Sequence, residues 1–172
     1  MTAIESDRSS PRRALLTRPA EQSALWFLGA LLQVRAGGRH TGGRFAIIEH
    51  TARRGYNAPA HVHAADDETF LVIDGNLRVH FGGETYETEP GGFALLPHGV
   101  EHAFVVTSPD ARFLTFHQPA GFDDFVMEVG TSAPSLVLPP APDGSPAPEA
   151  LQALSAAASR YGITIVGPPP AP

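Results

Sequence analysis

The sequence predicts an all-β fold, either a β-sandwich or a closed barrel, followed by short C-terminal helices. Two observations support this prediction. The 172 residues include 17 glycines and 17 prolines, a density of turn-forming residues that disfavours long helices in the middle of the chain. Between these residues lie roughly eight short segments that read as strands. The length suits one domain with a single core.

Composition narrows the classes of partner. The formal net charge is −6 and the basic residues form no dense run, which disfavours binding to a nucleic-acid backbone. The absence of cysteine excludes disulfides and thiolate metal sites. No segment approaches the roughly 20 apolar residues of a membrane span, and no long apolar stretch follows the N-terminal arginines. We therefore expect a cytoplasmic protein that binds neither nucleic acid nor membrane.

The first third of the chain contains one ambiguous segment. Residues 1–19 are polar and are expected to form a flexible arm before a β-barrel domain over 20–120. The apolar run 24–34 fits a helix and a doubly buried strand equally well. The glycine-rich segment 36–43 predicts a hairpin loop, and 44–51 is expected to be the returning strand.

Turn sequences divide the middle of the chain into short strands. Asp74-Gly75-Asn76 is a strong hairpin signal, and further turns are expected around Gly82-Gly83, at 89–92, at 97–99 and at 108–110. Pro59 favours an extended entry to His61. The strands between these turns are expected at 68–74, 77–81, 84–88, 93–96, 102–107 and 112–117.

In the last third of the chain the strand patterns give way to helical and proline-rich ones. Residues 121–166 are expected to form an extension of the barrel. Apolar residues at helical spacing predict a short amphipathic helix at 121–129. Residues 138–148 are proline-rich and expected to be extended. An alanine-rich helix is expected at 148–161, with a proline at its start and a glycine just past its end. Residues 167–172 form a tail with no packing signal.

Three histidines and one carboxylate form the main functional signal. His61 and His63 are two residues apart, so on a strand they project to the same face, about 7 Å apart along the chain. Glu68 opens the next strand, and closure of a barrel would bring His102 to the same place. This mixed N/O set predicts a site for one divalent transition metal ion: Fe, Mn, Co, Ni, Cu or Zn.

The spacing of these residues resembles the two signature motifs of the cupin superfamily. The only departure is at the last position of the second motif, where cupins often have asparagine and this chain has Val106. That asparagine is not a ligand, so the metal site is not put in doubt. The resemblance implies a double-stranded β-helix, a jelly-roll barrel, with the metal on His61, His63, Glu68 and His102. The motif residues are Gly55, His61, His63, Glu68 and Gly75, then Gly91, Pro97, Gly99 and His102.

Other polar residues are interpreted as structural or exposed. Asp66 and Asp67 are expected to be polar groups of a loop rather than ligands. Five further histidines lie outside the ligand spacing: His40, His50, His80, His98 and His117.

Strand parity predicts an apolar interior. Successive side chains of a strand point to opposite faces, so Phe70 and Val72 should face inward with Glu68. Phe104 should face inward with His102 for the same reason. The two phenylalanines are either pocket walls or plain core. No basic residue has this parity on the motif strands, although Arg44 or Arg78 could reach the site. We expect a neutral, aromatic substrate bound by Phe70, Val72 and Phe104.

A closer resemblance is to single-domain cupins of the quercetin 2,3-dioxygenase-like type. It covers both metal motifs and the segments 26–29, 41–43, 119–122 and 158–163. It implies O2-dependent cleavage of a flavonol heterocycle with release of carbon monoxide, with Glu68 taking the proton of the substrate 3-hydroxyl. It also implies a homodimer, and a C-terminal helix that caps the mouth with Phe122 and Phe125.

Two other functions stay open at this point. One is a different cupin enzyme of small-molecule metabolism, such as an isomerase, cyclase or decarboxylase. The other is a non-catalytic cupin that binds a small molecule, because binding cupins can keep the metal. Neither the metal nor the substrate can be read from the sequence.

Overall fold

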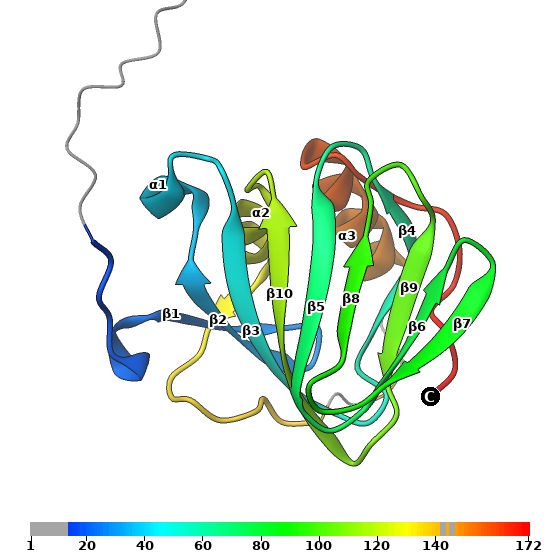
Figure 1. Cartoon of the computed structure of the whole chain (residues 1–172), viewed down its shortest axis with the longest axis horizontal. Helices are drawn as coiled ribbons and strands as arrows, with labels where there is room; N and C mark the ends of the chain where they lie inside the picture. Colours follow the sequence, from blue (N-terminus) through cyan, green and yellow to red (C-terminus); the bar gives the residue numbers. More distant parts are fainter. Residues whose placement is uncertain (1–13, 142–143, 145–146) are drawn as a thin grey trace, which may run out of the picture.

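Two β-sheets face each other and form the barrel that the sequence predicts (Figure 1). The computed structural model describes residues 14–141, 144 and 147–172. In spatial order, the larger sheet consists of β11 (Thr131–Ser132), β1 (Ser23–Phe27), β2 (Ala30–Ala36), β3 (Ala46–Arg53), β10 (Asp110–Gln118), β5 (Asp67–Asp74) and β8 (Phe93–Leu96). The smaller consists of β12 (Ile163–Ile165), β4 (Asn57–His63), β9 (His102–Val106), β6 (Leu77–Phe81) and β7 (Glu84–Thr88).

The helices are few and short, as expected. A 3₁₀ turn, η1, precedes β1, and the predicted helices near the C-terminal end are present with almost the predicted bounds. Over the described part of the chain the helices are η1 (Pro19–Glu21), α1 (Gly38–Thr41), α2 (Phe122–Val129) and α3 (Pro148–Arg160). Within the described residues, no helix is long and apolar enough to cross a lipid bilayer.

The inner faces of the two sheets make the core. Along β5 burial alternates strictly, so that Glu68, Phe70 and Val72 are buried while their neighbours are partly exposed. This alternation follows from the two-residue period of a strand. In β9 all five residues are buried. Phe70, Phe104 and Phe113 pack against one another at the centre, with ring centroids 5.2–5.9 Å apart.

Two predictions for the first third are corrected or resolved. The ambiguous run 24–34 is two strands: β1 and β2 pair as a hairpin through Leu28 (φ 50°) and Gly29 (φ 92°). Positive φ at both central residues suits the right-handed twist of paired strands. The predicted hairpin loop at 36–43 was wrong in part, because Gly38–Thr41 forms one turn of helix. Most of the predicted arm, 1–19, lies outside the described residues.

The hairpin turn between β5 and β6 requires its glycine. Gly75 has φ 77°, which disfavours other L-residues. A Cβ at this position would also lie 2.2 Å from the backbone oxygen of Asp110 and 2.6 Å from Ser108 Oγ. The turn therefore packs directly against the start of β10, and this contact ties the two sheets together at one end of the barrel.

The C-terminal segment completes both sheets. β11 pairs with β1, and β12 pairs with β4. With only three residues, β12 was too short to predict from the sequence. After β12 the chain stays on the barrel: Gly167 donates to the Ala60 backbone oxygen, and Ala60 donates to Pro168. The predicted extended segment 138–148 lies partly outside the described residues.

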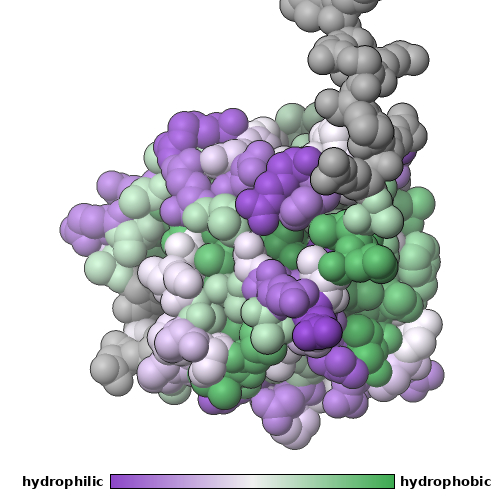
Figure 2. Space-filling view, turned by 90° about the vertical axis from the view of Figure 1, so that its left-hand side faces the viewer, coloured by the Kyte–Doolittle hydropathy of each residue, from purple (hydrophilic) through white to green (hydrophobic). Residues whose placement is uncertain are grey.

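One outer face of the barrel is partly hydrophobic. Figure 2 shows hydrophobic side chains gathered among polar ones on the face that carries α1 and β1. Exposed large hydrophobic residues of the chain include Leu28, Leu136 and Val137.

Candidate metal centre

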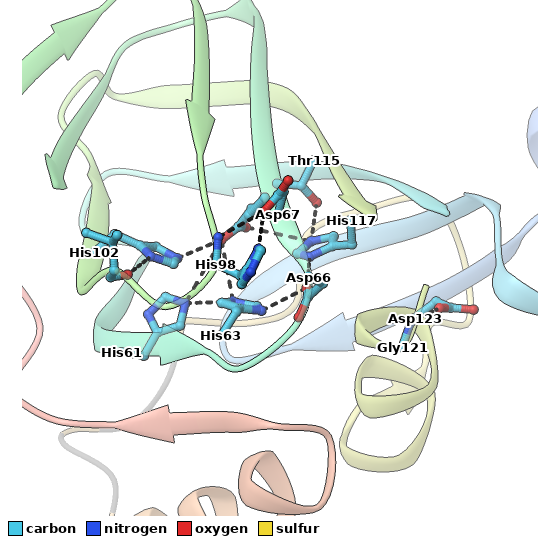
Figure 3. Close-up of polar contacts among 12 residues, drawn as sticks. His61, His63, Asp66, Asp67, His98, His102, Thr115, His117, Gly121 and Asp123 are labelled. Atoms are coloured by element: carbon cyan, nitrogen blue, oxygen red, sulfur yellow. Dashed lines mark hydrogen bonds and ion pairs between the residues drawn. The ribbon is translucent and has the colours of Figure 1, made fainter. Parts of the chain in front are cut away.

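The barrel brings the four predicted ligands together in its interior. His61 and His63 come from β4, Glu68 from β5 and His102 from β9. Each is at most 7% exposed, and their donor atoms lie within 4.8 Å of one another. Figure 3 shows the rings of His61, His63 and His102 turned toward a common point. Strand pairing accounts for this convergence, because His61 is directly opposite His102 across the β4–β9 ladder.

Hydrogen bonds fix which ring nitrogen of each histidine faces the centre. His61 Nδ1 lies 2.7 Å from the Pro59 backbone oxygen, and His102 Nδ1 lies 3.0 Å from the Val100 backbone oxygen. His63 Nδ1 lies 2.8 Å from Asp66 Oδ2. All three partners are acceptors, so each Nδ1 carries its proton, and in the neutral ring each Nε2 presents a lone pair.

The spacing of the inward atoms fits a single cation. His61 Nε2 and His63 Nε2 are 3.1 Å apart, as are His102 Nε2 and Glu68 Oε2. Glu68 Oε2 lies 3.6 Å from His63 Nε2 and 4.0 Å from His61 Nε2. Atoms bound about 2.1 Å from one ion lie about 3 Å apart when they subtend a right angle. Two imidazole lone pairs at this separation repel unless a cation lies between them, so the residues present fit a divalent metal ion.

The electrostatics of the cluster favour a cation in the same place. Burial, with a smaller contribution from the neighbouring His102, lowers the pKa of His61 to about 4. Burial alone would raise the pKa of Glu68, but the hydrogen bond with His102 and the nearby imidazoles hold it below its ordinary value. Burial opposes protonation of His102, yet its hydrogen bond with Glu68 raises its pKa. Positive charge is therefore favoured between Glu68 Oε2 and His102 Nε2, where a metal ion would supply it.

Asp66 and His117 support the cluster from behind. Asp66 Oδ2 lies 2.8 Å from His63 Nδ1 and 3.0 Å from His117 Nδ1, and Figure 3 shows this carboxylate next to both rings. His63, Asp66 and His117 are also close enough to hold a metal, but these are hydrogen-bond lengths. Burial raises the pKa of Asp66, and its bonds to His117 and His63 outweigh this effect, so the pKa is well below its usual range.

Sequence reasoning missed the contribution of β10 to the site. Asp66 was expected only as a polar loop residue, and His117 as structural or exposed. His117 is fully buried, because it is paired with Glu68 across the β5–β10 ladder. The available signal was parity: Phe113, Thr115 and His117 alternate along one strand and point inward together. His98, by contrast, is exposed and pairs with Asp67, Nδ1 to Oδ1 2.6 Å.

An apolar cavity of about 70 Å³ opens beside the cluster. His61 and Glu68 are both part of its wall. Its other polar residues are His50, Tyr56 and Asn57, and the remainder are apolar: Phe27, Leu28, Ala58, Pro59, Phe104, Phe122, Phe125, Leu154, Ala158, Ile163 and Ile165. The helices α2 and α3 therefore contribute to the wall, including the two phenylalanines expected to cap it.

The three predicted substrate-binding residues occupy different places. Phe104 lines the cavity, whereas Phe70 and Val72 lie in the core and are not part of the cavity wall. Arg44 and Arg78, the two basic residues that could have faced a charged substrate, are not part of the cavity wall. Arg44 Nε donates to the Thr41 backbone oxygen, and Arg78 pairs with Glu87, Nε to Oε1 2.6 Å.

Comparisons with known proteins indicate the family of the barrel. Residues 48–117 match the model of the cupin domain family. The quercetin 2,3-dioxygenase of Bacillus subtilis is 23% identical over 100 residues, which cover 58% of this chain and 30% of that protein. The quercetin 2,3-dioxygenase of Aspergillus japonicus is 30% identical over 78 residues, which cover 42% of this chain and 22% of that protein. The match thus spans less than a third of either dioxygenase.

A solved structure is similar over more of its length. The polyketide cyclase RemF of Streptomyces resistomycificus superposes with a TM-score of 0.53 at 21% identity, covering 62% of this chain and 80% of that one. This likeness concerns the fold. The two-sheet barrel, the buried four-residue cluster and the matched cupin domain together identify the chain as a member of the cupin superfamily that resembles the quercetinase-like cupins.

Proposed function

We propose that this protein is an enzyme, a metal-dependent dioxygenase that opens the heterocycle of a flavonol such as quercetin, or of a related aromatic enol. The observation that carries the proposal is the placement of the cluster: His61 and Glu68 are both ligand candidates and part of the wall of an apolar cavity. A small aromatic molecule in that cavity would lie against the cluster. The similarity to two quercetin 2,3-dioxygenases supports the choice of substrate class.

His61, His63, Glu68 and His102 would hold the ion. Three imidazoles and one carboxylate suit Fe, Mn, Ni, Co, Cu or Zn, and the ligand types do not select among them. When bound, the metal supplies Lewis acidity that makes a nearby substrate hydroxyl more acidic, and open positions for oxygen ligands.

Glu68 is the proposed base. Its carboxylate is ionised, because the surrounding imidazoles hold its pKa below the ordinary value. A carboxylate with so low a pKa is a weak base, so it can take a proton only from a hydroxyl already made acidic at the same site. The contact with His102 uses Oε2, which leaves Oε1 for the substrate proton. His117 Nε2 lies 3.7 Å from Oε1, beyond hydrogen-bond distance, so Oε1 is not occupied by that ring.

The residues of the cavity wall favour a substrate with aromatic rings and little charge. Phe104, Phe122 and Phe125 offer ring faces and edges to a flat ligand and exclude water from it. No arginine belongs to the cavity wall formed by residues 27–165, so a dianion would find no compensating charge there. A largely neutral aromatic substrate is the best match, with Phe70 and Val72 supporting Phe104 from the core.

The test is metal analysis of the purified protein, followed by an oxygen-electrode assay with quercetin. Oxygen consumption with release of carbon monoxide, both dependent on the metal, is the expected result. Absence of turnover across a panel of flavonols at saturating metal would overturn the proposal. In that case an O2-independent conversion would indicate an isomerase, cyclase or decarboxylase, and thermal stabilisation by a ligand without any product would indicate a binding cupin.

A further inference from the structure

Two hydrogen-bonded side chains form a polar position in the otherwise apolar cavity, separate from the metal cluster. His50 Nδ1 lies 3.3 Å from the Tyr56 hydroxyl oxygen, and both residues belong to the cavity wall. His50 is 2% and Tyr56 9% exposed. Phe113 stacks on His50 with ring centroids 4.6 Å apart and planes at 12°, which fixes the orientation of the imidazole.

A continuous chain of hydrogen bonds connects this pair to Asp66. Asp66 Oδ2 bonds His117 Nδ1 at 3.0 Å, and His117 Nε2 bonds Thr115 Oγ1 at 3.2 Å. Thr115 Oγ1 in turn bonds His50 Nε2 at 3.0 Å. Figure 3 shows the part of this chain that runs from Asp66 through His117 to Thr115. Thr115 and His117 are fully buried, so water does not substitute for either link.

The carboxylate at one end gives the chain a direction. An ionised carboxylate only accepts hydrogen bonds, so His117 donates from Nδ1, and in the neutral ring its Nε2 is an acceptor. The Thr115 hydroxyl has one proton and gives it to His117 Nε2. Its oxygen must therefore accept from His50 Nε2.

The same reasoning fixes the last link. A neutral His50 that donates from Nε2 presents a lone pair at Nδ1, so the Tyr56 hydroxyl donates to it. Burial, the main influence on both groups, lowers the pKa of His50 to about 3 and raises that of Tyr56 above its ordinary value, which keeps both neutral. With its proton committed to His50, Tyr56 Oη retains only acceptor capacity, and among the described residues no donor reaches it.

We infer that Tyr56 is a specificity-determining residue that accepts a hydrogen bond from the bound ligand, with its polarity set by the chain from Asp66 through His117, Thr115 and His50. The cavity then selects a ligand that carries a hydroxyl or N–H donor on an aromatic frame. A ligand that offers only acceptors leaves the acceptor lone pair of Tyr56 Oη buried without a partner, which is unfavourable. This inference refines the proposed aromatic-enol substrate, and it rests on that proposal only in taking the same cavity as the ligand site.

The first experiment reads the direction of the chain without any substrate. Long-range ¹H–¹⁵N spectra of the zinc-loaded protein report which nitrogen of each imidazole carries the proton, and the His50 signals are assigned by their loss in His50→Gln. The expected result is a single His50 tautomer with the proton on Nε2. A proton on Nδ1 would mean that Tyr56 donates into the cavity, and would overturn the inference.

The second experiment measures the preference that follows. Phenol and anisole are compared as ligands of the zinc-loaded protein by calorimetry, and phenol is expected to bind about fivefold more tightly, the worth of one ordinary hydrogen bond. In Thr115→Val, which keeps the shape and removes the hydroxyl, we expect mixed His50 tautomers and a phenol preference below about twofold. Thr115→Ser should restore both.

An unchanged phenol preference in Thr115→Val would overturn the role of the hydrogen-bond chain from Asp66 to Tyr56. If Thr115→Val does not fold, the tautomer of wild-type His50 still decides the direction. Neither measurement uses flavonol turnover, so an inactive enzyme that retains the Nε2–H tautomer and the phenol preference would reject the proposed reaction and leave this inference standing. A His50 proton on Nδ1 together with normal oxygen consumption would reject this inference and leave the proposed reaction standing.

Discussion

The Nε2 atoms of His61 and His63 lie 3.1 Å apart in the interior of the barrel, and each ring donates its Nδ1 proton to an acceptor on the other side. The two lone pairs therefore face each other. This arrangement is unfavourable without a cation and stable with one, so the cluster could hold a metal ion.

Loss of one inward imidazole should abolish tight metal binding. We expect His61→Ala to lower the affinity for a divalent ion by more than about a hundredfold, because even changes behind the ligands cost ten- to a hundredfold. The measurement is metal content after dialysis, together with the melting temperature with and without added metal. His98→Ala removes an exposed histidine paired with Asp67 and is the matched control. Equal metal content in both variants would contradict the assignment of His61.

Glu68→Gln separates the base from the ligand. The amide oxygen can still face the ion but does not accept the substrate proton, so turnover is expected to fall more severely than metal content. The comparison requires kcat and bound metal from the same preparation. Glu87→Gln, on the edge strand β7 and exposed, should change neither. If Glu68→Gln loses metal and activity in equal proportion, the proposed base role is removed.

Asp66 and its neighbour Asp67 provide a matched pair. Asp66 accepts hydrogen bonds from His63 and His117, whereas Asp67 bonds only the backbone and side chain of His98. We expect Asp66→Asn to reduce metal affinity by about ten- to a hundredfold, because one of the two rings loses its acceptor. Asp67→Asn should have little effect. Competition with a calibrated chelator measures both, and an Asp66→Asn affinity equal to that of Asp67→Asn would refute the role.

Acid should destabilise the protein through His50. Burial lowers its pKa to about 3 from an ordinary 6.5, so between these values the unfolded chain binds a proton that the folded protein does not. Stability therefore falls as the pH falls through this window, by about 2 kcal/mol at pH 5. Urea unfolding of the chelated protein from pH 7 to pH 4 measures the slope. Burial also lowers the pKa of His61 to about 4, so His50→Gln should reduce the slope without abolishing it, whatever its effect at pH 7. An unchanged slope would show that other groups cause the loss.

Gly75→Ala tests the turn against β10. The added Cβ would lie 2.2 Å from the Asp110 backbone oxygen at a φ of 77°, so we expect a loss of about 2–4 kcal/mol in the free energy of unfolding. Gly82→Ala is the control, because φ is also positive (58°) but nothing lies within 4 Å. It should cost only about 1 kcal/mol. Similar losses in the two variants would show that the backbone angle alone matters.

Local pattern explains what was predictable. The alternation along β5 placed Glu68, Phe70 and Val72 on one face, and the burial of that strand has the same period. The two-residue spacing of His61 and His63 likewise anticipated their convergence. The segment 24–34 could not be assigned, because a run that is apolar throughout has no period.

Features that depend on the pairing register of strands distant in the sequence could not be predicted. His117 joins the site because it is paired with Glu68, 49 positions earlier in the sequence, and no local pattern reports that register. Phe70 and Phe104 have equivalent parity, yet only Phe104 reaches the cavity, because the depth of a residue along the barrel is not encoded in its parity. The homodimer and the cytoplasmic location stay predictions.

The pairing of β12 with β4 places His63 opposite Ile163 and His61 opposite Ile165. All four candidate ligands come before these isoleucines in the sequence, and without β12 the strand β4 has a free edge and the cavity lacks one wall. Synthesis from the N-terminus therefore makes the candidate ligands before the strand that covers them. A chain that lacks β12 would expose the candidate site along the edge of β4, and β12 would close it.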